Sequence, residues 1–132
     1  MNNLLIECCA NGVQSAINGA KGGASRIELC SNLMVGGLTP KYKDIIKAKE
    51  KLTIPLHILI RPRGGNFIYN DDDFNQILSD IAVCKDICCA GVVIGSLNID
   101  GSINKKQTKA MVDSAKPMHI TFHRAFDEGN NL

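Results

Sequence analysis

Two cysteines that close neighbouring predicted strands are the residues best suited to bind a soft metal ion. Cys9 ends the apolar run 4–9, and Cys30 ends the run 25–30. Side chains alternate between the two faces of a strand, and adjacent parallel strands lie about 4.8 Å apart. Two inward thiols at matching heights could therefore share one ion, and thiolates favour Cu(I) over harder ions. From the spacing alone, however, the better interpretation is that both cysteines only fill space in the core, as free cysteines often do.

Two carboxylates lie two residues before these cysteines. Glu7 and Glu28 fall on the same strand faces as the thiols, one layer deeper. Carboxylates that share a cavity raise the pKa of one of the pair, as acid–base catalysis requires. The candidate catalytic residues are Glu7, Glu28, His57 and His123. An equally good interpretation is a buried ion network in which neighbouring cations neutralise the carboxylates.

Basic side chains gather at the predicted mouth of the same site. Arg61 and His123 lie near the ends of the third and fifth predicted strands, and Arg63 follows two residues after Arg61. Guanidinium groups bind phosphate and carboxylate through paired hydrogen bonds, and Gly64 and Gly65 allow close approach of the backbone. We expect Arg61, Arg63 and His123 to bind a small anionic molecule. For Arg63 the alternative is a solvated loop residue.

The other cysteines carry weaker signals. Cys84 and Cys88 have the i, i+4 spacing of a metal-binding pair on a helix, but they fall on its apolar stripe, so core packing is the better interpretation. Cys8 points outward from the first strand and is expected to pack beneath a helix. No Cys-x-x-Cys pair or Cys/His finger spacing occurs, so a structural zinc site is not expected.

Strands and helices must alternate along the chain to place these residues. The predicted strands are 4–9, 25–30, 56–62, 91–97 and 118–123. The predicted helices are 12–21, 40–52, 71–89 and 104–115, with Thr39 and Asn104 as N-caps of the second and fourth. This alternation is typical of parallel βαβ units. No glycine-rich phosphate-binding motif follows a strand, so no nucleotide cofactor is expected.

The predicted strands are polar on one face only. That face carries Glu7, Cys9, Arg26, Glu28, Cys30, His57, Arg61, His119 and His123, whereas the opposite face is mainly isoleucine and leucine. A parallel sheet covered by helices on both faces would read as continuous apolar runs. The polar face therefore predicts the interior of a (β/α) barrel near its open mouth, where ligands bind at the carboxyl ends of the strands.

Composition sets broad limits on partners and compartment. The chain has 132 residues, 45% of them hydrophobic, and a net charge of +2. Such a weak charge gives no support for nucleic acid or a membrane surface as partner. Without a signal sequence or a long apolar run, a cytoplasmic location with reduced thiols is expected.

Four segments resemble the copper homeostasis protein CutC family: RIELCSNLMVGGLTP, HILIRPRGGNFIYNDDDF, GVVIGSLNIDG and TFHRAFD. The resemblance extends over essentially the whole chain, with Glu-x-Cys at 7–9. It implies a TIM-barrel-like α/β fold in a cytosolic protein linked to copper handling. It also implies Cu(I) binding by the thiols of Cys9 and Cys30. No established enzyme activity comes with it.

The length limits what this barrel can be. A complete (β/α)8 barrel needs on the order of 200–250 residues. Residues 1–132 are therefore expected to form a single partial barrel domain, truncated after about four and a half βα units. Unpaired edges on the first and last strands predict either a homo-oligomer or a truncated product of marginal stability. Three functions stay open: a cytosolic Cu(I)-binding copper homeostasis protein, a barrel enzyme acting on a small anionic (phosphate or carboxylate) metabolite, and an inactive truncated fragment.

Overall fold

Five parallel strands form one sheet in the order β1-β2-β3-β4-β5 in this computed structural model, which describes residues 3–130. Strands that follow each other in the chain are neighbours in the sheet, as in a (β/α) barrel and unlike a doubly wound fold. The prediction of an α/β fold with parallel strands is confirmed. The strands are β1 (Glu7–Asn11), β2 (Arg26–Cys30), β3 (Leu56–Leu59), β4 (Gly91–Ile94) and β5 (His119–Phe122).

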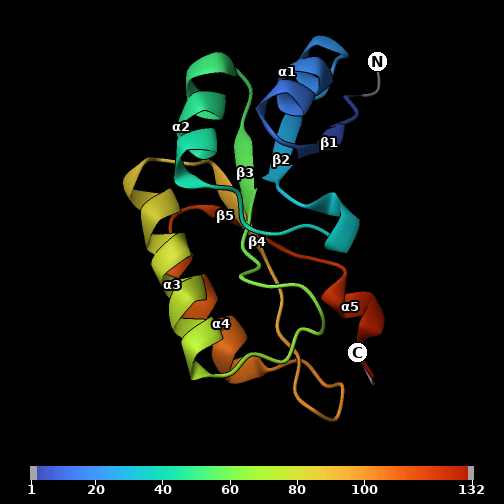
Figure 1. Cartoon of the computed structure of the whole chain (residues 1–132), viewed down its shortest axis with the longest axis vertical. Helices are drawn as coiled ribbons and strands as arrows, with labels where there is room; N and C mark the ends of the chain where they lie inside the picture. Colours follow the sequence, from blue (N-terminus) through green and yellow to red (C-terminus); the bar gives the residue numbers. More distant parts are fainter. Residues whose placement is uncertain (1–2, 131–132) are drawn as a thin grey trace.

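Four helices connect the strands and pack on the outward face of the sheet. In Figure 1 the helices α2, α3 and α4 lie to one side of the strands, and the short helix α5 lies to the other side. Residues 3–130 also contain one 3₁₀ turn, η1. The bounds are α1 (Val13–Lys21), η1 (Leu33–Val35), α2 (Tyr42–Lys51), α3 (Asp71–Asp86), α4 (Lys105–Ala115) and α5 (Ala125–Glu128).

Side-chain caps fix the starts of α3 and α4, which pack against each other. The Asn70 side chain accepts a hydrogen bond from the backbone N–H of Asp73 at 2.8 Å. The Asn104 side chain accepts one from the backbone N–H of Gln107 at 3.0 Å, so the predicted N-cap at Asn104 is confirmed. Both caps satisfy amide groups that the first turn of a helix leaves without a partner.

The two faces of the sheet differ as the alternation of side chains predicts. Ile27, Leu29 and Ile58 point outward and are completely buried beneath the helices. Cys8 shares this face and packs against the core and α1, as predicted. The inward face holds the polar side chains, and the register sets Cys9 opposite Glu28 in the parallel pair β1–β2.

The first strand begins later than the predicted run 4–9. β1 starts at Glu7, and Leu4, Leu5 and Ile6 are 75%, 80% and 57% exposed. The reason is that β2 starts only at Arg26, so no residue of that strand lies opposite positions 4 and 5. The strands β1 and β5 are the edges of the sheet among the described residues, and a homo-oligomer formed through them stays a prediction.

Two predicted helix boundaries are also wrong. The second helix begins at Tyr42 rather than residue 40, because the Thr39 hydroxyl accepts from the backbone N–H of Arg61 at 2.8 Å instead of capping the helix. The third helix ends at Asp86 rather than residue 89, because Cys88 adopts a left-handed conformation with φ of 60°, which cannot continue a right-handed helix. Cys88 is consequently exposed, and its predicted core packing is wrong.

Candidate functional site

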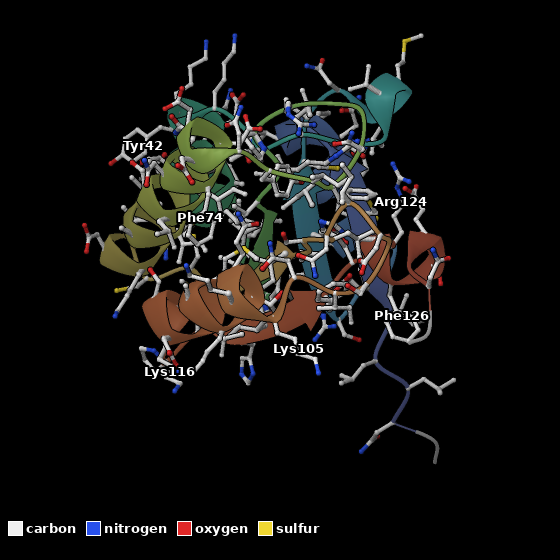
Figure 2. All side chains as sticks on the ribbon, turned by 90° about the horizontal axis from the view of Figure 1, so that it is seen from below. Tyr42, Phe74, Lys105, Lys116, Arg124 and Phe126 are labelled. Atoms are coloured by element: carbon white, nitrogen blue, oxygen red, sulfur yellow. The ribbon has the colours of Figure 1, made fainter. Side chains whose placement is uncertain are left out.

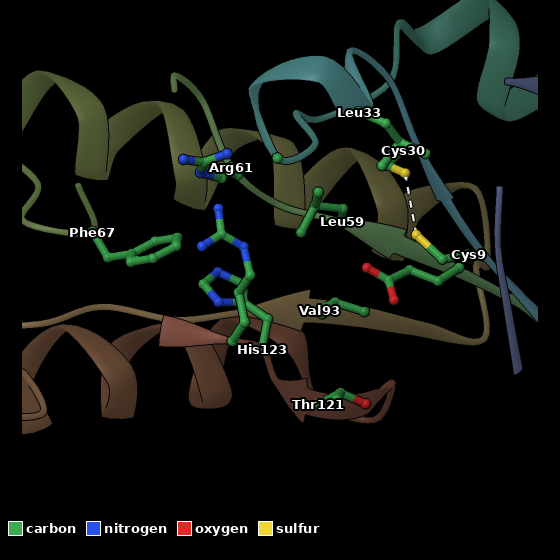
Figure 3. Close-up of a pocket in the computed structure, with 12 residues that line it drawn as sticks. Cys9, Cys30, Leu33, Leu59, Arg61, Phe67, Val93, Thr121 and His123 are labelled. Atoms are coloured by element: carbon green, nitrogen blue, oxygen red, sulfur yellow. Dashed lines mark hydrogen bonds between the residues drawn. The ribbon is translucent and has the colours of Figure 1, made fainter. Parts of the chain in front are cut away.

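A cavity of about 250 Å³ lies over the carboxyl ends of the strands, on the polar face of the sheet. Figure 3 shows that it has two distinct ends. Cys9 and Cys30 lie at one end, whereas Arg61, Phe67 and His123 lie at the other. Apolar side chains, among them Leu59 and Val93, line the wall between them.

The two thiols of the predicted metal site lie in contact. Their Sγ atoms are 3.6 Å apart, and the Cys30 thiol also approaches the carbonyl oxygen of Ala10 at 3.3 Å. The sequence predicted two thiols at matching heights, and this prediction is wrong. Cys30 lies opposite Asn11 in the register, whereas Cys9 lies opposite Glu28. The side chains meet across this diagonal. Cys9 is exposed and Cys30 is buried, so the pair is open to the cavity from one side.

Both thiols are held in the protonated form near neutral pH. Burial and the neighbouring Cys9 raise the pKa of the Cys30 thiol to about 12. Burial also raises the pKa of Cys9, with a further rise from the carboxylate of Glu28. A metal ion bound here must therefore displace thiol protons.

The two predicted carboxylates occupy different environments. Arg26 forms an ion pair with Glu7. Glu28 lines the cavity next to the thiols, where burial and the nearby Glu7 raise its pKa to about 7. Glu28 is therefore the carboxyl group in this cavity that can both give and accept a proton near neutral pH.

His57 lies opposite Glu28 in the register of β2 and β3, but it does not line this cavity. It is 2% exposed, and its ring stacks on that of His119 with centroids 6.1 Å apart. Burial, together with the charge of Arg26, lowers the pKa of His57. Of the four candidate catalytic residues, Glu28 and His123 line the cavity, whereas Glu7 and His57 do not.

The side chain of Arg61 lies inside the protein, at 2% exposure. Its guanidinium donates to the carbonyl oxygens of Val35, Gly37 and Gly65 at 2.7–2.9 Å, which ties two loops to the end of β3. Its Nε atom is buried and has no hydrogen-bond partner among the described residues. Arg61 therefore holds the loops and still faces the cavity.

Arg63 takes a different position from the one predicted for an anion-binding residue. Its Nε atom donates to Asp73 at 2.9 Å, and its remaining N–H groups donate to Asn66, Ile68 and Gly64. The guanidinium also lies over the ring of Tyr69. Arg63 is not part of the cavity lining, so the structure separates it from Arg61 and His123.

The basic end of the cavity, at Arg61 and His123, also holds Phe67 and Arg124, which are not among the predicted ligand-binding residues. Phe67 is 1% exposed, and the Arg61 and Arg124 guanidinium carbons lie 5.0 Å and 5.1 Å from the centre of its ring. Phe67 lies in a loop whose sequence has no periodicity to reveal its position. Arg124 follows His123 directly, and the turn into α5 brings it to the cavity. The signal for Arg124 was its adjacency to a predicted site residue.

Within residues 3–130, no group of three or more His, Cys, Asp or Glu side chains is arranged to hold a metal ion. The thiol pair is therefore a two-ligand arrangement. Structural zinc sites need four ligands and catalytic ones usually three. The donor set fits a soft ion that accepts few ligands.

Comparison with known proteins places the chain in one family. The model of the CutC family matches residues 4–132. A CutC family protein of Mesorhizobium japonicum is 40% identical over 123 residues, which are 93% of this chain and 48% of the relative. The mouse copper homeostasis protein cutC homolog is 43% identical over 126 residues, covering 96% and 46%.

A solved structure gives the same result for the fold. The crystal structure of a CutC protein from Streptococcus agalactiae matches with a TM-score of 0.88 and 34% identity. The match covers 96% of this chain and 62% of the other. The TIM-barrel-like fold is thereby confirmed, and the chain spans about half the length of the curated relatives it matches.

Proposed function

The chain belongs to the CutC family, and on that premise we propose that it is a copper-handling protein that binds Cu(I) through Cys9 and Cys30. Relatives in mouse and human are named copper homeostasis protein cutC homologs. All six cysteines are free, which agrees with a reducing compartment such as the cytoplasm. No helix in residues 3–130 is long and apolar enough to cross a membrane.

The observation that carries the proposal is the contact between the two thiols. Two sulfur atoms 3.6 Å apart can bind one ion between them with little movement of either side chain. Thiolates prefer soft ions, and Cu(I) is the soft ion that suits a pair of sulfur ligands without a third or fourth partner. Because adjacent strands hold the two cysteines, the backbone ladder fixes the distance between them.

Glu28 supports this chemistry from the neighbouring inward-facing position on β2, two residues before Cys30. Binding must release protons from both thiols, and a carboxylate with a pKa of about 7 beside Cys9 can accept one of them. Before it takes up this proton, its negative charge attracts a cation into the cavity. The chain thus supplies the ligands and a proton acceptor at one end of the cavity.

The test is an anaerobic Cu(I) titration in competition with a chromophoric Cu(I) chelator. We expect the wild-type protein to bind one Cu(I) and the Cys9→Ser/Cys30→Ser double variant to bind none under the same conditions. Cys88→Ser is the matched control, because it removes an exposed thiol outside the cavity. A double variant that binds Cu(I) as tightly as the wild type would show that the site is elsewhere.

A second candidate function is that of a barrel enzyme in which Glu28 transfers a proton. The specific observation in its favour is the Glu28 pKa of about 7, against 4.5 for an ordinary glutamate. Carbon-13 NMR of the carboxyl groups tests this premise directly. A titration midpoint near 7 for Glu28, absent from the Glu28→Gln spectrum, would support it, whereas a midpoint near 4.5 would remove the candidate.

A further inference from the structure

We propose that the end of the cavity opposite the thiols is an oxyanion-binding subsite, in which Arg61, His123 and Arg124 bind the carboxylate or phosphate group of a small molecule. This inference rests on the second candidate function and deepens it by naming the substrate class. It follows from charge, unpartnered donors and the shape of this end of the cavity.

Arg61 is a buried cation without a counter-ion. It makes no ion pair among the described residues, and its three hydrogen-bond partners are all backbone carbonyls. The three bonds use its two terminal nitrogens, and the N–H of the third nitrogen, Nε, is buried and unused among the described residues. A buried charge is costly unless an opposite charge accompanies it. The carbonyls satisfy the geometry of the guanidinium but leave its charge uncompensated.

Arg124 brings a second positive charge to the same place. A side chain at Gly36, which has a φ of +90°, would collide with the Arg124 guanidinium and would lie 3.1 Å from a terminal nitrogen of Arg61. Both guanidinium groups therefore converge on this glycine, and both lie over the ring of Phe67. Arg124 pairs with Glu128, which is half exposed. An oxyanion between the two arginines would relieve their repulsion.

His123 adds a neutral donor. Its Nδ1 atom accepts a hydrogen bond from the backbone N–H of Ala125 at 3.1 Å, so the proton of the neutral ring is on Nε2. Nε2 is buried and has no partner among the described residues. Burial and the charges of Arg61 and Arg124 lower the pKa of His123 to about 4, which keeps the ring neutral at pH 7. The missing side chain of Gly95 makes room for this ring.

The two ends of the cavity suit one ligand of modest size. Leu59 and Val93 separate the basic end from Glu28 and the thiols, so an oxyanion and a reacting centre can occupy opposite ends of about 250 Å³. Arg63 does not compete for this role, because Asp73 and loop carbonyls already occupy its donors. The subsite therefore selects small anionic molecules rather than neutral ones.

The test is calorimetric titration of the whole chain with three probes at constant ionic strength: sulfate, inorganic phosphate and malonate. We expect saturable binding of at least one probe, and the tighter of phosphate and malonate identifies the preferred oxyanion. Arg124→Gln should weaken that binding about tenfold or more, the loss expected for one charge-assisted hydrogen bond. Arg124 is half exposed, so this variant should fold.

Lys116→Gln is the matched control. Like Arg124, Lys116 is exposed and pairs with a carboxylate on its own helical segment, and Figure 2 shows it at the opposite end of the molecule. It should bind the probes as the wild type does. Equal losses of affinity in Arg124→Gln and Lys116→Gln would mean that only the net charge of the protein matters, and would overturn the proposal. Loss of binding in Arg63→Gln but not in Arg124→Gln would also overturn it. The experiment measures binding and not turnover. If the probes bind but no catalysis is found, the result therefore counts only against proton transfer by Glu28 and not against the subsite.

Discussion

Two groups of cysteines occupy opposite ends of the sheet, and their thiols lie in different surroundings. Cys9 and Cys30 lie at the carboxyl ends of adjacent strands and share a cavity. Cys84, Cys88 and Cys89 lie where α3 turns into β4, at the amino end. Cys84 is 1% exposed in the apolar core, and its hydrogen bond with the Cys89 thiol, together with burial, raises its pKa. Cys88 is exposed, so the three thiols of this group face different surroundings.

The difference is not one of available space. A second cavity of about 300 Å³ adjoins Cys88 and Cys89, and it is no smaller than the first. What separates the two groups is how the backbone presents the thiols. Neighbouring strands hold Cys9 and Cys30 in a hydrogen-bonded ladder, so the side chains meet over the polar face. A helix end turns successive side chains in different directions, so Cys88 is exposed and Cys89 is buried, although both line the second cavity.

The sharpest test of this comparison exchanges one buried thiol in each group for a hydroxyl. Cys30→Ser should weaken Cu(I) binding at least about hundredfold, because losing a ligand costs more than losing a residue that merely orients one. The serine hydroxyl can still donate to the carbonyl of Ala10, so the fold should persist. Cys89→Ser, at 5% exposure, is the control and should keep wild-type affinity. Equal affinities in all three proteins would contradict the comparison.

The pH dependence of Cu(I) binding provides the second test. The pKa of Cys30 is about 12 and that of Cys9 is raised, so binding must release protons at neutral pH. Release of one proton increases the affinity about tenfold for each pH unit, and release of two increases it more. We expect the affinity to rise by at least that slope from pH 6 to pH 8 in the chelator competition. A flat profile would mean that the ligands are already ionised or are not these thiols.

Much of this arrangement follows from the sequence by simple alternation. The period of two along 25–30 predicts that Arg26, Glu28 and Cys30 share a face, and the structure agrees. It works because each strand is short and its outward face is uniformly apolar. The start of β1 was wrong because the apolar side chains at 4–6 read as strand interior, although no residue of β2 lies opposite positions 4 and 5.

The loops were beyond that kind of reasoning. Arg61 and Arg63 look equivalent in the sequence, two residues apart with the same charge, yet one faces the cavity and the other pairs with Asp73. That choice depends on where loop carbonyls and the first turn of α3 lie in space. Phe67 escapes prediction for the same reason, because irregular segments have no period from which to read the direction of a side chain.

The effects on protein stability should be the reverse of those on copper binding: the cysteine in the core should matter more than the cysteine at the cavity. Cys84→Ser places a hydroxyl in the apolar core and should lower the free energy of unfolding by about 1–3 kcal/mol. Cys9→Ser alters an exposed position and should change it by less than about 0.5 kcal/mol. Urea denaturation of both variants under reducing conditions measures this. A larger loss in Cys9→Ser than in Cys84→Ser would show that the pair at the cavity is itself a core element.

The smallest expected effect concerns Cys88, whose φ of 60° is a conformation that side chains with a Cβ adopt at a cost of about 1–2 kcal/mol. Glycine removes that cost but loses about 0.5–1 kcal/mol of conformational entropy on folding, so Cys88→Gly should stabilise the protein by about 0.5 kcal/mol. Cys88→Ala is the matched control, because it removes the thiol and keeps the strained Cβ; it should give no gain in the same denaturation experiment. If alanine stabilised as much as glycine, the thiol rather than the backbone would be the source of the effect. The expected order instead makes Cys88 a backbone position at which a cysteine is tolerated, unlike Cys9 and Cys30, where the sulfur is the proposed metal ligand.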